Sequence, residues 1–295
     1  MSRHFTALVN PISGAGVAAD RWRELAEIAT AAGAQVSVEL TRSSEHATEI
    51  AAAAAANGDV VVAVGGDGLV LAACAGVVAA GAGVLGIAPA GRGNDLARKL
   101  GIPSDPRALA NLLITGEPRA IDVLDADGTI VPGNVYAGLD SVATLRINAR
   151  RRLPGKLNYR LTPVETFLGW KPPTFTVTVD GETITTLAHM VVVANSGTYG
   201  HGLDIVPGAV VDDGLLDVLI VRATKKRHFL RFQSQLGHGS HLQRSDVTRV
   251  RGVSASRPPP PPPPPPAPAP PRRGWPPPPR PPPGPPPGAA APRPR

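Results

Sequence analysis

The first 125 residues alternate short β-prone runs with helical patterns, and this alternation limits the chain to few folds. Strand patterns cover residues 5–9, 35–40, 59–64 and 84–88, and helical patterns cover 18–32, 44–56, 69–80, 94–100 and 106–115. Residues 59–64 are almost entirely apolar, which is typical of a parallel strand that is buried on both faces. Strands and helices alternating at this spacing predict a parallel α/β sheet.

The pattern changes after about residue 119. Further strand patterns cover 120–124, 134–137, 174–179, 190–194 and 215–221, and helical patterns cover 141–151, 156–168 and 226–237. Asp-Gly pairs at 127–128, 180–181 and 213–214 are hairpin-type turn signals. We therefore expect an α/β domain over 1–125, a mainly β domain over 126–253, and a separate tail over 254–295.

Proline is concentrated in that tail, where 24 of the 35 prolines follow Ser254. The tail also has six arginines and no acidic residue, so the formal net charge of +7 falls to +1 without it. Proline runs fix φ and remove backbone donors, so we expect residues 254–295 to be disordered. A ligand for proline-binding modules, a tail without a role and a sequence read in a wrong frame are three interpretations that stay open. The positive charge belongs to the tail and gives no reason to expect a nucleic-acid partner.

Other features exclude further classes. The single cysteine, Cys74, rules out a disulfide framework and a cysteine-based zinc cluster, and we interpret it as a small core residue. Residues 69–90 carry no charge, but their alanines, glycines and Pro89 favour a helix, a turn and a buried strand over a membrane span. Residues 5–9 are too short for the apolar core of a signal peptide. We expect a cytoplasmic protein.

Three glycine-rich loops each follow a predicted strand and precede a predicted helix. They are Asn10-Pro11-Ile12-Ser13-Gly14-Ala15-Gly16, Gly65-Gly66-Asp67-Gly68 and Gly91-Arg92-Gly93-Asn94-Asp95. Glycines let the backbone approach a ligand, and amides at a helix start attract anions. Each loop alone is weak evidence, since Gly-Gly-Asp-Gly is more often a tight turn than a nucleotide site, and a turn or a helix cap also explains the other two loops. Together, at one edge of one sheet, they predict a nucleotide-phosphate site. Neither a Walker motif nor a Gly-x-Gly-x-x-Gly follows the first strand.

These motifs, in this order and spacing, resemble the diacylglycerol kinase catalytic domain, which bacterial lipid kinases and sphingosine and ceramide kinases share. Val192-Val193-Ala194-Asn195, Tyr199-Gly200, Pro207-Gly208 and Asp212-Asp213-Gly214-Leu215-Leu216-Asp217 resemble the C-terminal domain of the same family. The resemblance covers about residues 4–253. It implies an ATP-dependent lipid kinase that uses Mg²⁺, works in phospholipid biosynthesis and meets its lipid substrate at the membrane surface; a homodimer is compatible with it.

The resemblance also assigns roles to residues. It places at ATP the residues Asn10, Ser13, Gly14, Thr41, Gly65, Gly66, Asp67, Gly68, Gly91, Arg92, Gly93, Asn94 and Asp95. Asp67 would lie near the metal and phosphates. The magnesium loop of the family falls on the Asp213 carboxylate and the backbone carbonyls of Val210 and Leu215, and such oxygen ligands suit Mg²⁺.

Three departures from the family pattern matter. Leu69 stands where the family usually has Thr, so a hydroxyl is lost beside the phosphates. Arg92 replaces another Thr and could pair with a phosphate, or it is a solvent-facing loop charge. The general base of the family is a Glu in a later Asp-Gly-Glu turn, whereas here no acidic residue follows Asp246. The Asp180-Gly181-Glu182 turn matches an earlier hairpin, so the sequence assigns no catalytic base.

Weaker candidates complete the set. His238 and His241 could ligate a metal, but surface or packing roles are favoured because no partner cluster is visible. Basic residues over 150–160, namely Arg150, Arg151, Arg152, Lys156 and Arg160, could meet anionic headgroups or form a solvated helix face. Two alternatives to a lipid kinase stay open: a nucleotide-binding protein with impaired catalysis, because its base is missing, and a kinase of a soluble hydroxyl similar to NAD kinases.

Overall fold

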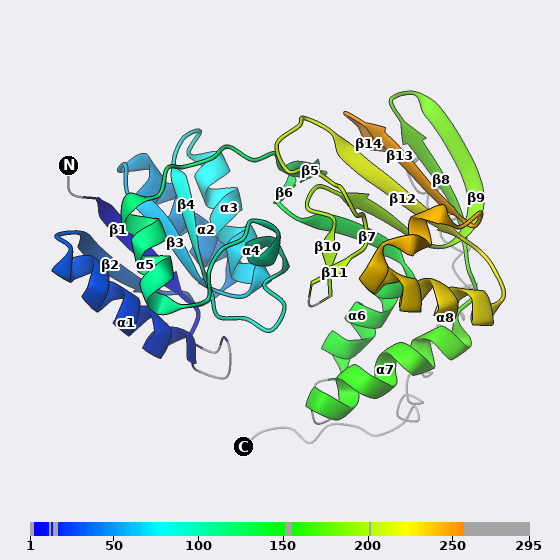
Figure 1. Ribbon diagram of the computed structural model, residues 1–295, viewed down its shortest axis with the longest axis horizontal. Helices are drawn as coiled ribbons and strands as arrows, with labels where there is room; N and C mark the ends of the chain where they lie inside the picture. The colour runs from blue at the N-terminus through cyan, green and yellow to red at the C-terminus, as the bar shows by residue number, and fades with distance from the viewer. Residues whose placement is uncertain (1–2, 12, 14–16, 151–154, 201, 257–295) are drawn as a thin grey trace, which may run out of the picture. The chain divides into compact units, whose positions relative to one another are not determined.

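The computed structural model describes residues 3–11, 13, 17–150, 155–200 and 202–256, and its helices and strands are labelled in Figure 1. The N-terminal part contains a four-stranded parallel sheet in the order β2-β1-β3-β4. These strands are β1 (His4–Val9), β2 (Gln35–Leu40), β3 (Val60–Gly65) and β4 (Val84–Pro89). The predicted parallel sheet is confirmed, with boundaries that differ by no more than one residue.

Helices cover both faces of this sheet (Figure 1). One face packs against α1 (Val17–Ala31) and α5 (Pro106–Thr115) through a core that includes Phe5, Trp22 and Leu109. The other face packs against α2 (Ser44–Ala56), α3 (Asp67–Ala79) and the short α4 (Asp95–Lys99). The central strands are apolar because both their faces are buried in this way.

Local signals determine where these helices begin. The Ser43 side chain accepts a hydrogen bond from the His46 amide before α2, and Asp105 accepts one from the Ala108 amide before α5. Helix α3 begins at Asp67, two residues before the predicted start. Gly66 is its N-cap, so Asp67 and Gly68 belong to the first helical turn rather than to a loop. The second glycine-rich motif is therefore a strand end joined almost directly to a helix.

The connection between the two parts of the chain differs from prediction. Residues 120–123, expected in a strand, form none; β5 (Leu124–Ala126) starts at the end of that segment and pairs with β6 (Thr129–Val131). The Asp122 amide donates to the carbonyl of Val211 at 2.6 Å, and Arg119 lies 3.5 Å from Asp212. These bonds tie the connection to the loop before β12 (Leu216–Arg222). A groove of about 640 Å³, lined mainly by aliphatic side chains, lies between β4 and this connection.

The second part of the chain is built on antiparallel strands in the order β13-β12-β9-β8-β14, with β7 also paired to β9. The strands are β7 (Asn134–Gly138), β8 (Thr174–Val179), β9 (Glu182–Ala194), β12 (Leu216–Arg222), β13 (Val247–Gly252) and β14 (Ala255–Ser256). The first half of β9 pairs with β8 and the second half with β7 and β12. This long strand was predicted only over its apolar end, because its threonine-rich first half is half-exposed.

Two cores hold this sheet. Val177, Val191 and Ile220 belong to the core between the β8 and β12 regions. The opposite core contains Phe229 and Phe232 of α8 (Lys226–Gln235) and Leu139 of α6 (Leu139–Ala149). Helix α7 (Gly155–Gly169) lies beside α6 (Figure 1). An N-terminal parallel α/β sheet followed by a mainly β domain was the predicted fold class, and it is confirmed.

The last described strands were not predicted. Strand β13 pairs with β12 over its whole length, and β14 pairs with only Val179 and Thr178 of β8. The Asp180 carboxylate accepts hydrogen bonds from the Val253 and Ser254 amides, which turns the chain into β14. The expected boundary at residue 254 is therefore too early, and residues 257–295 lie outside the described part. Within that part, no helix combines the length and apolarity needed to cross a bilayer.

Candidate nucleotide site

The three glycine-rich motifs meet at the carboxyl ends of the parallel strands. The chain passes from β1 outward to β2 and then across β1 to β3, so β1 and β3 flank a topological switch point. Ligands bind in open α/β sheets at such a point. The first motif follows β1, the second follows β3 and the third follows β4. The predicted register of the three loops is therefore present in the structure.

The second and third motifs touch through their backbones. A methyl group placed on Gly91 would lie 2.4 Å from the Gly66 Cα atom, and one on Gly66 would lie 3.2 Å from Gly91 Cα. A side chain on Gly91 would collide with the Gly66 backbone, and one on Gly66 would be tight against Gly91. The Ala90 amide also donates to the Gly65 carbonyl at 2.8 Å.

Asp67 binds the third motif directly. Its carboxylate oxygens accept hydrogen bonds from the backbone amides of Asn94 and Asp95, both at 2.8 Å. Asn94 has the left-handed φ of +53°, and its side chain exchanges two 2.9 Å hydrogen bonds with the Gly91 backbone. Asp67 is itself exposed. The aspartate that was assigned to the metal and phosphates thus shapes the loop that would bind them.

The first motif and Thr41 lie beside this centre. A methyl group on Gly65 would lie 3.3 Å from Ser13 Oγ, so Ser13 reaches the end of β3. The Asn10 amide donates to the Val64 carbonyl at 3.4 Å, and the Thr41 amide donates to the Val9 carbonyl at 2.9 Å. Gly14 lies outside the described residues.

Two further assigned positions can now be placed. Leu69 is buried beneath Gly65, where a methyl group would lie 2.8 Å from Leu69 Cδ2. The leucine that replaces the usual threonine therefore fills core space. Arg92 is exposed on the third motif, and whether it meets a phosphate stays a prediction.

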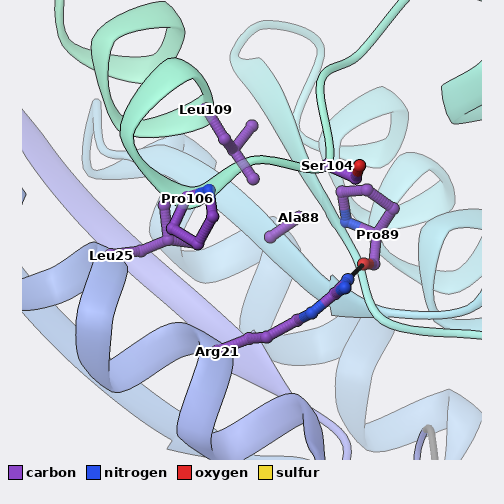
Figure 2. A pocket seen from close by; sticks show the side chains of 7 residues that line it. All are labelled: Arg21, Leu25, Ala88, Pro89, Ser104, Pro106 and Leu109. Atoms are coloured by element: carbon purple, nitrogen blue, oxygen red, sulfur yellow. Dashed lines mark hydrogen bonds between the residues drawn. The ribbon is translucent and has the colours of Figure 1, made fainter.

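An arginine of α1 supports the end of β4. Figure 2 shows Arg21 extending from α1 to the Pro89 carbonyl, to which its guanidinium donates at 2.6 Å. Pro89 ends β4 two residues before the third motif begins. The bond therefore fixes the sheet edge from which this motif emerges and brings a positive charge to it.

Loops of the second domain contact the third motif. The Gly202 amide donates to the Asp95 carboxylate at 3.0 Å, and Lys99 Nζ donates to the Ala209 carbonyl at 2.7 Å. Gly202 follows β10 (Thr198–Tyr199) and precedes β11 (Leu203–Asp204). Gly202, which lies near the Tyr199-Gly200 motif, is thereby brought to the third motif.

Sequence reasoning missed Asn134 and Tyr136 of β7. Asn134 Nδ2 donates to the Tyr136 hydroxyl at 2.9 Å. Burial raises the pKa of Tyr136 above its ordinary value; the hydrogen bond from Asn134 lowers it, and the charges of Asp95, Asp140 and Asp67 raise it further. These carboxylates therefore lie within electrostatic reach of the phenol. An asparagine two residues from a tyrosine in a strand shares its face, which is the only sequence signal for this pair.

The residues assigned to magnesium have other partners. Asp213 accepts a hydrogen bond from the Leu215 amide at 3.1 Å, and its other oxygen binds the Arg251 guanidinium. A cation placed at this carboxylate would share it with a positive charge, so the donor set as arranged does not suit Mg²⁺. The described residues contain no group of three or more histidine, cysteine or acidic side chains that could hold a metal. Magnesium at Val210, Asp213 and Leu215 stays a prediction.

Several carboxylates of the second domain are engaged by cations or amides. Asp217 is buried beside Arg249 and Arg251, and Asp246 is bound by Arg244. Desolvation opposes ionisation of Asp246, but its bonds to Arg244 dominate and lower its pKa. These groups are tied into structure and poorly placed to accept a substrate proton.

The two histidines considered as metal ligands have different surroundings. His241 is fully buried, its Nε2 lies 2.8 Å from the Ile205 carbonyl, and its ring meets Phe232 edge-on. His238 is exposed. Packing explains the first and a surface position the second, as favoured from sequence.

Comparison with known proteins agrees with this geometry. The family model described as the diacylglycerol kinase catalytic domain matches residues 4–126, and the one described as the YegS C-terminal NAD kinase beta sandwich-like domain matches residues 133–256. A diacylglycerol kinase of Mycobacterium tuberculosis is 34% identical over 256 residues, covering 83% of this chain and 82% of that enzyme. The fold and site therefore define a two-domain protein of the lipid kinase class.

Other relatives point the same way. A diacylglycerol kinase of Bacillus subtilis is 26% identical over 239 residues, covering 80% of this chain and 79% of that enzyme. The crystal structure of a putative diacylglycerol kinase from Bacillus anthracis has the same fold, with a TM-score of 0.71 at 23% identity over 86% of this chain and 83% of that one. The chain belongs to the diacylglycerol kinase family.

Proposed function

We propose that this protein transfers the γ-phosphate of ATP to the hydroxyl group of a membrane lipid such as diacylglycerol or a sphingoid base. The observation that carries the proposal is the assembly of the three motifs around Asp67 at the switch point of the sheet. Family membership supports the same reaction. Backbone amides, Ser13 and Thr41 would hold the nucleotide, and Asp67 and Asn94 would keep the third motif in shape.

Transfer needs little covalent chemistry from the protein. The bond from the γ-phosphorus to the β–γ bridging oxygen breaks with its electron pair left on ADP, and a new bond forms to the lipid oxygen, whose proton is released. Positioning and charge neutralisation provide most of the acceleration. Magnesium arriving with ATP would neutralise part of the phosphate charge.

A nucleotide-binding protein with impaired catalysis is the second candidate, and one observation favours it. No acidic residue follows Asp246, and Asp213, Asp217 and Asp246 are bound by arginines. A general base contributes roughly 10²- to 10⁴-fold. We therefore propose a slow kinase rather than an inactive one, because the described residues of the three motifs lie together at the strand ends.

The helices α6 and α7 support contact with a lipid surface. They expose large apolar side chains, with 68% of Leu145, 44% of Leu161, 54% of Val164 and 63% of Leu168 accessible. Exposed Arg146 and Lys171 lie on or just after the same helices. Exposed leucines flanked by cations suit an anionic bilayer. Arg150, considered as a headgroup ligand, is paired with Glu165.

Vesicle sedimentation tests this surface. We expect Leu145→Ser with Leu168→Ser to lower the fraction bound to phosphatidylcholine vesicles containing phosphatidylglycerol. Val38→Ser, at a 49% exposed valine of β2, is the matched control and should bind like the wild type. Equal binding by the double variant would exclude α6 and α7 as the docking surface.

A substrate panel tests the reaction itself. Purified protein is given ATP labelled on its γ-phosphate, with vesicles containing diacylglycerol, a sphingoid base or ceramide, and separately with NAD. We expect label in one lipid and dependence on vesicles. Label in NAD alone would favour a soluble-substrate kinase, and ATP binding without transfer would favour the impaired nucleotide-binding protein.

A further inference from the structure

Cationic side chains of the chain itself contact the loop of residues 207–215, which precedes β12. The Arg249 guanidinium donates a hydrogen bond to the Pro207 carbonyl at 3.1 Å, and Lys99 Nζ donates to the Ala209 carbonyl at 2.7 Å. Backbone carbonyls of this kind are also the oxygen ligands that hard metal cations take in proteins. In this loop they are bound by cations that the protein supplies.

The acidic residues of this loop also have cationic partners. Arg119 Nε lies 3.5 Å from Asp212 Oδ2, although the Arg119 side chain is 63% exposed and such a pair is weak. The Arg251 guanidinium donates to Asp213 Oδ2, and the Leu215 amide donates to Asp213 Oδ1 at 3.1 Å. Both carboxylate oxygens of Asp213 are therefore engaged within the protein.

Strand pairing fixes the position of Arg251. Arg251 of β13 lies opposite Asp217 of β12 in the antiparallel register, and its Nε is 3.3 Å from Asp217 Oδ1. The Asp217 side chain is only 2% exposed, and Arg249 Nε donates to the same oxygen at 2.7 Å. Arg251 thus bridges a buried carboxylate on the sheet and the Asp213 carboxylate in the loop, as a divalent cation would.

A guanidinium in this place competes with a metal ion. A buried carboxylate that loses a partner is costly, so Asp217 favours keeping Arg251 beside it. Two positive charges at one carboxylate repel each other at short range. Magnesium also loses its water reluctantly and needs near-octahedral oxygen ligands. Asp213 is the single carboxylate of the set predicted for it, beside the Val210 and Leu215 carbonyls.

We propose that Arg251 is the internal counter-ion of Asp213 and takes the place of the magnesium ion predicted there. The 207–215 loop then keeps its shape without a divalent cation. This inference goes beyond the proposed function, because it concerns the protein without nucleotide. Lys99 is the last residue of α4, so the loop held in this way contacts the helix that follows the third motif. Magnesium reaches that motif together with the phosphates of ATP.

Manganese binding to the full-length, nucleotide-free protein tests the proposal, because Mn²⁺ takes the same oxygen ligands as Mg²⁺. The electron paramagnetic resonance signal of free Mn²⁺ falls as the ion binds. We expect the wild-type protein and Asp213→Asn to leave the same free signal, since the carboxylate binds no ion in the wild type.

Arg251→Ala removes the guanidinium, and Arg249 still pairs with Asp217. The Mn²⁺ affinity of this variant should rise about tenfold or more, because a positive charge next to the carboxylate is lost. Adding Asp213→Asn to Arg251→Ala should abolish the gain.

Arg244→Ala is the matched control. It removes the arginine from Asp246, another arginine–aspartate pair of the same domain, and should gain no Mn²⁺ affinity. The proposal is overturned if the wild-type protein binds Mn²⁺ and Asp213→Asn does not. It is also overturned if Arg251→Ala gains nothing, or if Arg244→Ala gains as much, because any freed carboxylate would then give the same result.

Circular dichroism shows whether Arg251→Ala is folded. If it is not, Arg251→Gln takes its place in the same comparison, since glutamine keeps a hydrogen-bond donor without the charge. None of these measurements uses ATP or a lipid. A protein that phosphorylates no lipid would therefore fail the proposed function alone, and Mn²⁺ binding would still decide the role of Arg251.

Discussion

Asp67 is the residue on which the arrangement of the third motif depends. Its carboxylate accepts hydrogen bonds from the Asn94 and Asp95 amides. Among the described contacts, no other side chain accepts a hydrogen bond from these two amides. We expect Asp67→Ala to weaken Mg·ATP binding at least tenfold, a loss of about 1.4 kcal/mol. The readout is the rise in melting temperature that saturating Mg·ATP produces, since ligand stabilisation follows affinity.

Asp105→Ala controls for the loss of a helix cap. Asp105 accepts the Ala108 amide before α5, so its removal should lower stability by about 0.5–2 kcal/mol. It should leave the nucleotide-induced shift unchanged. An Asp67→Ala protein with a wild-type shift would remove Asp67 from the site.

A second prediction at the scale of single residues concerns the Cys74 thiol. Burial raises the pKa of its thiol from 9.0 to about 11. The neutral thiol is therefore favoured by folding, and this contribution is complete below pH 9 and is lost as pH rises toward 11. By pH 10.5 the loss should be about 2 kcal/mol.

The free energy of unfolding, measured with urea at pH 8 and pH 10.5, tests this effect. Cys74→Ala is the control, because other groups titrate in the same pH range. The stability of the wild-type protein should fall by about 2 kcal/mol more than that of the variant. Parallel losses in the two proteins would show that the thiol does not titrate with folding.

At the scale of elements, helices α2 and α3 pack unusually closely at Gly76. A methyl group there would lie 2.4 Å from the Thr48 carbonyl oxygen and 2.6 Å from Ala51 Cβ. Gly76→Ala should therefore destabilise the protein by about 1–3 kcal/mol, despite the better helix propensity of alanine.

Thermal unfolding provides the measurement, and a drop of several degrees is expected at about 2–4 °C per kcal/mol. Gly237→Ala is the control, since nothing lies within 4 Å of a methyl group at that position. Comparable melting temperatures for Gly76→Ala and wild type would mean that the two helices can move apart freely.

Regular elements were predictable where local signals agree. The apolar run ending at Val64 predicts a strand and the serine before α2 predicts a helix start, and neither signal depends on tertiary contacts. Residues 120–123 have strand character, but their backbone bonds lead to Val211 and Asn195, which only the tertiary fold brings near. Strand β13 was not predicted because two arginines in six residues argue against a strand. Arg249 and Arg251 pair with Asp217 and Asp213, from another strand and a loop, which only the tertiary fold brings near.

The candidate site likewise contains residues that the sequence predicts and residues that it does not. Glycine motifs can be recognised in a sequence because close backbone approach and tight turns disfavour other residues. Gly66 and Gly91 are examples. Tyr136 has no such signal, since a tyrosine in a strand is ordinary, and only its neighbours distinguish it. The role of Asp67 as a loop ligand likewise required the position of Asn94.

At the scale of the whole molecule, the proline-rich tail is predicted to add nothing to the stability of the fold. The family match and β14 both end at residue 256. The remaining residues have few apolar side chains to offset an ordering cost of about 1–2 kcal/mol each. Deleting residues 257–295 should therefore leave the melting temperature within about 1 °C of the full-length protein, as measured by calorimetry. A fall of several degrees would show that the tail contributes to the folded state.

The central proposal is that this protein binds Mg·ATP through the three motifs but transfers phosphate slowly, because no acidic residue follows Asp246. The direct measurement compares lipid phosphorylation at saturating Mg·ATP by this protein and by a chimera whose residues after 256 come from the M. tuberculosis relative. We predict a chimera that is about 10²- to 10⁴-fold faster with unchanged ATP affinity, the range of a general base. Equal rates in the two proteins would contradict the account, because another residue of this chain would then be accepting the proton.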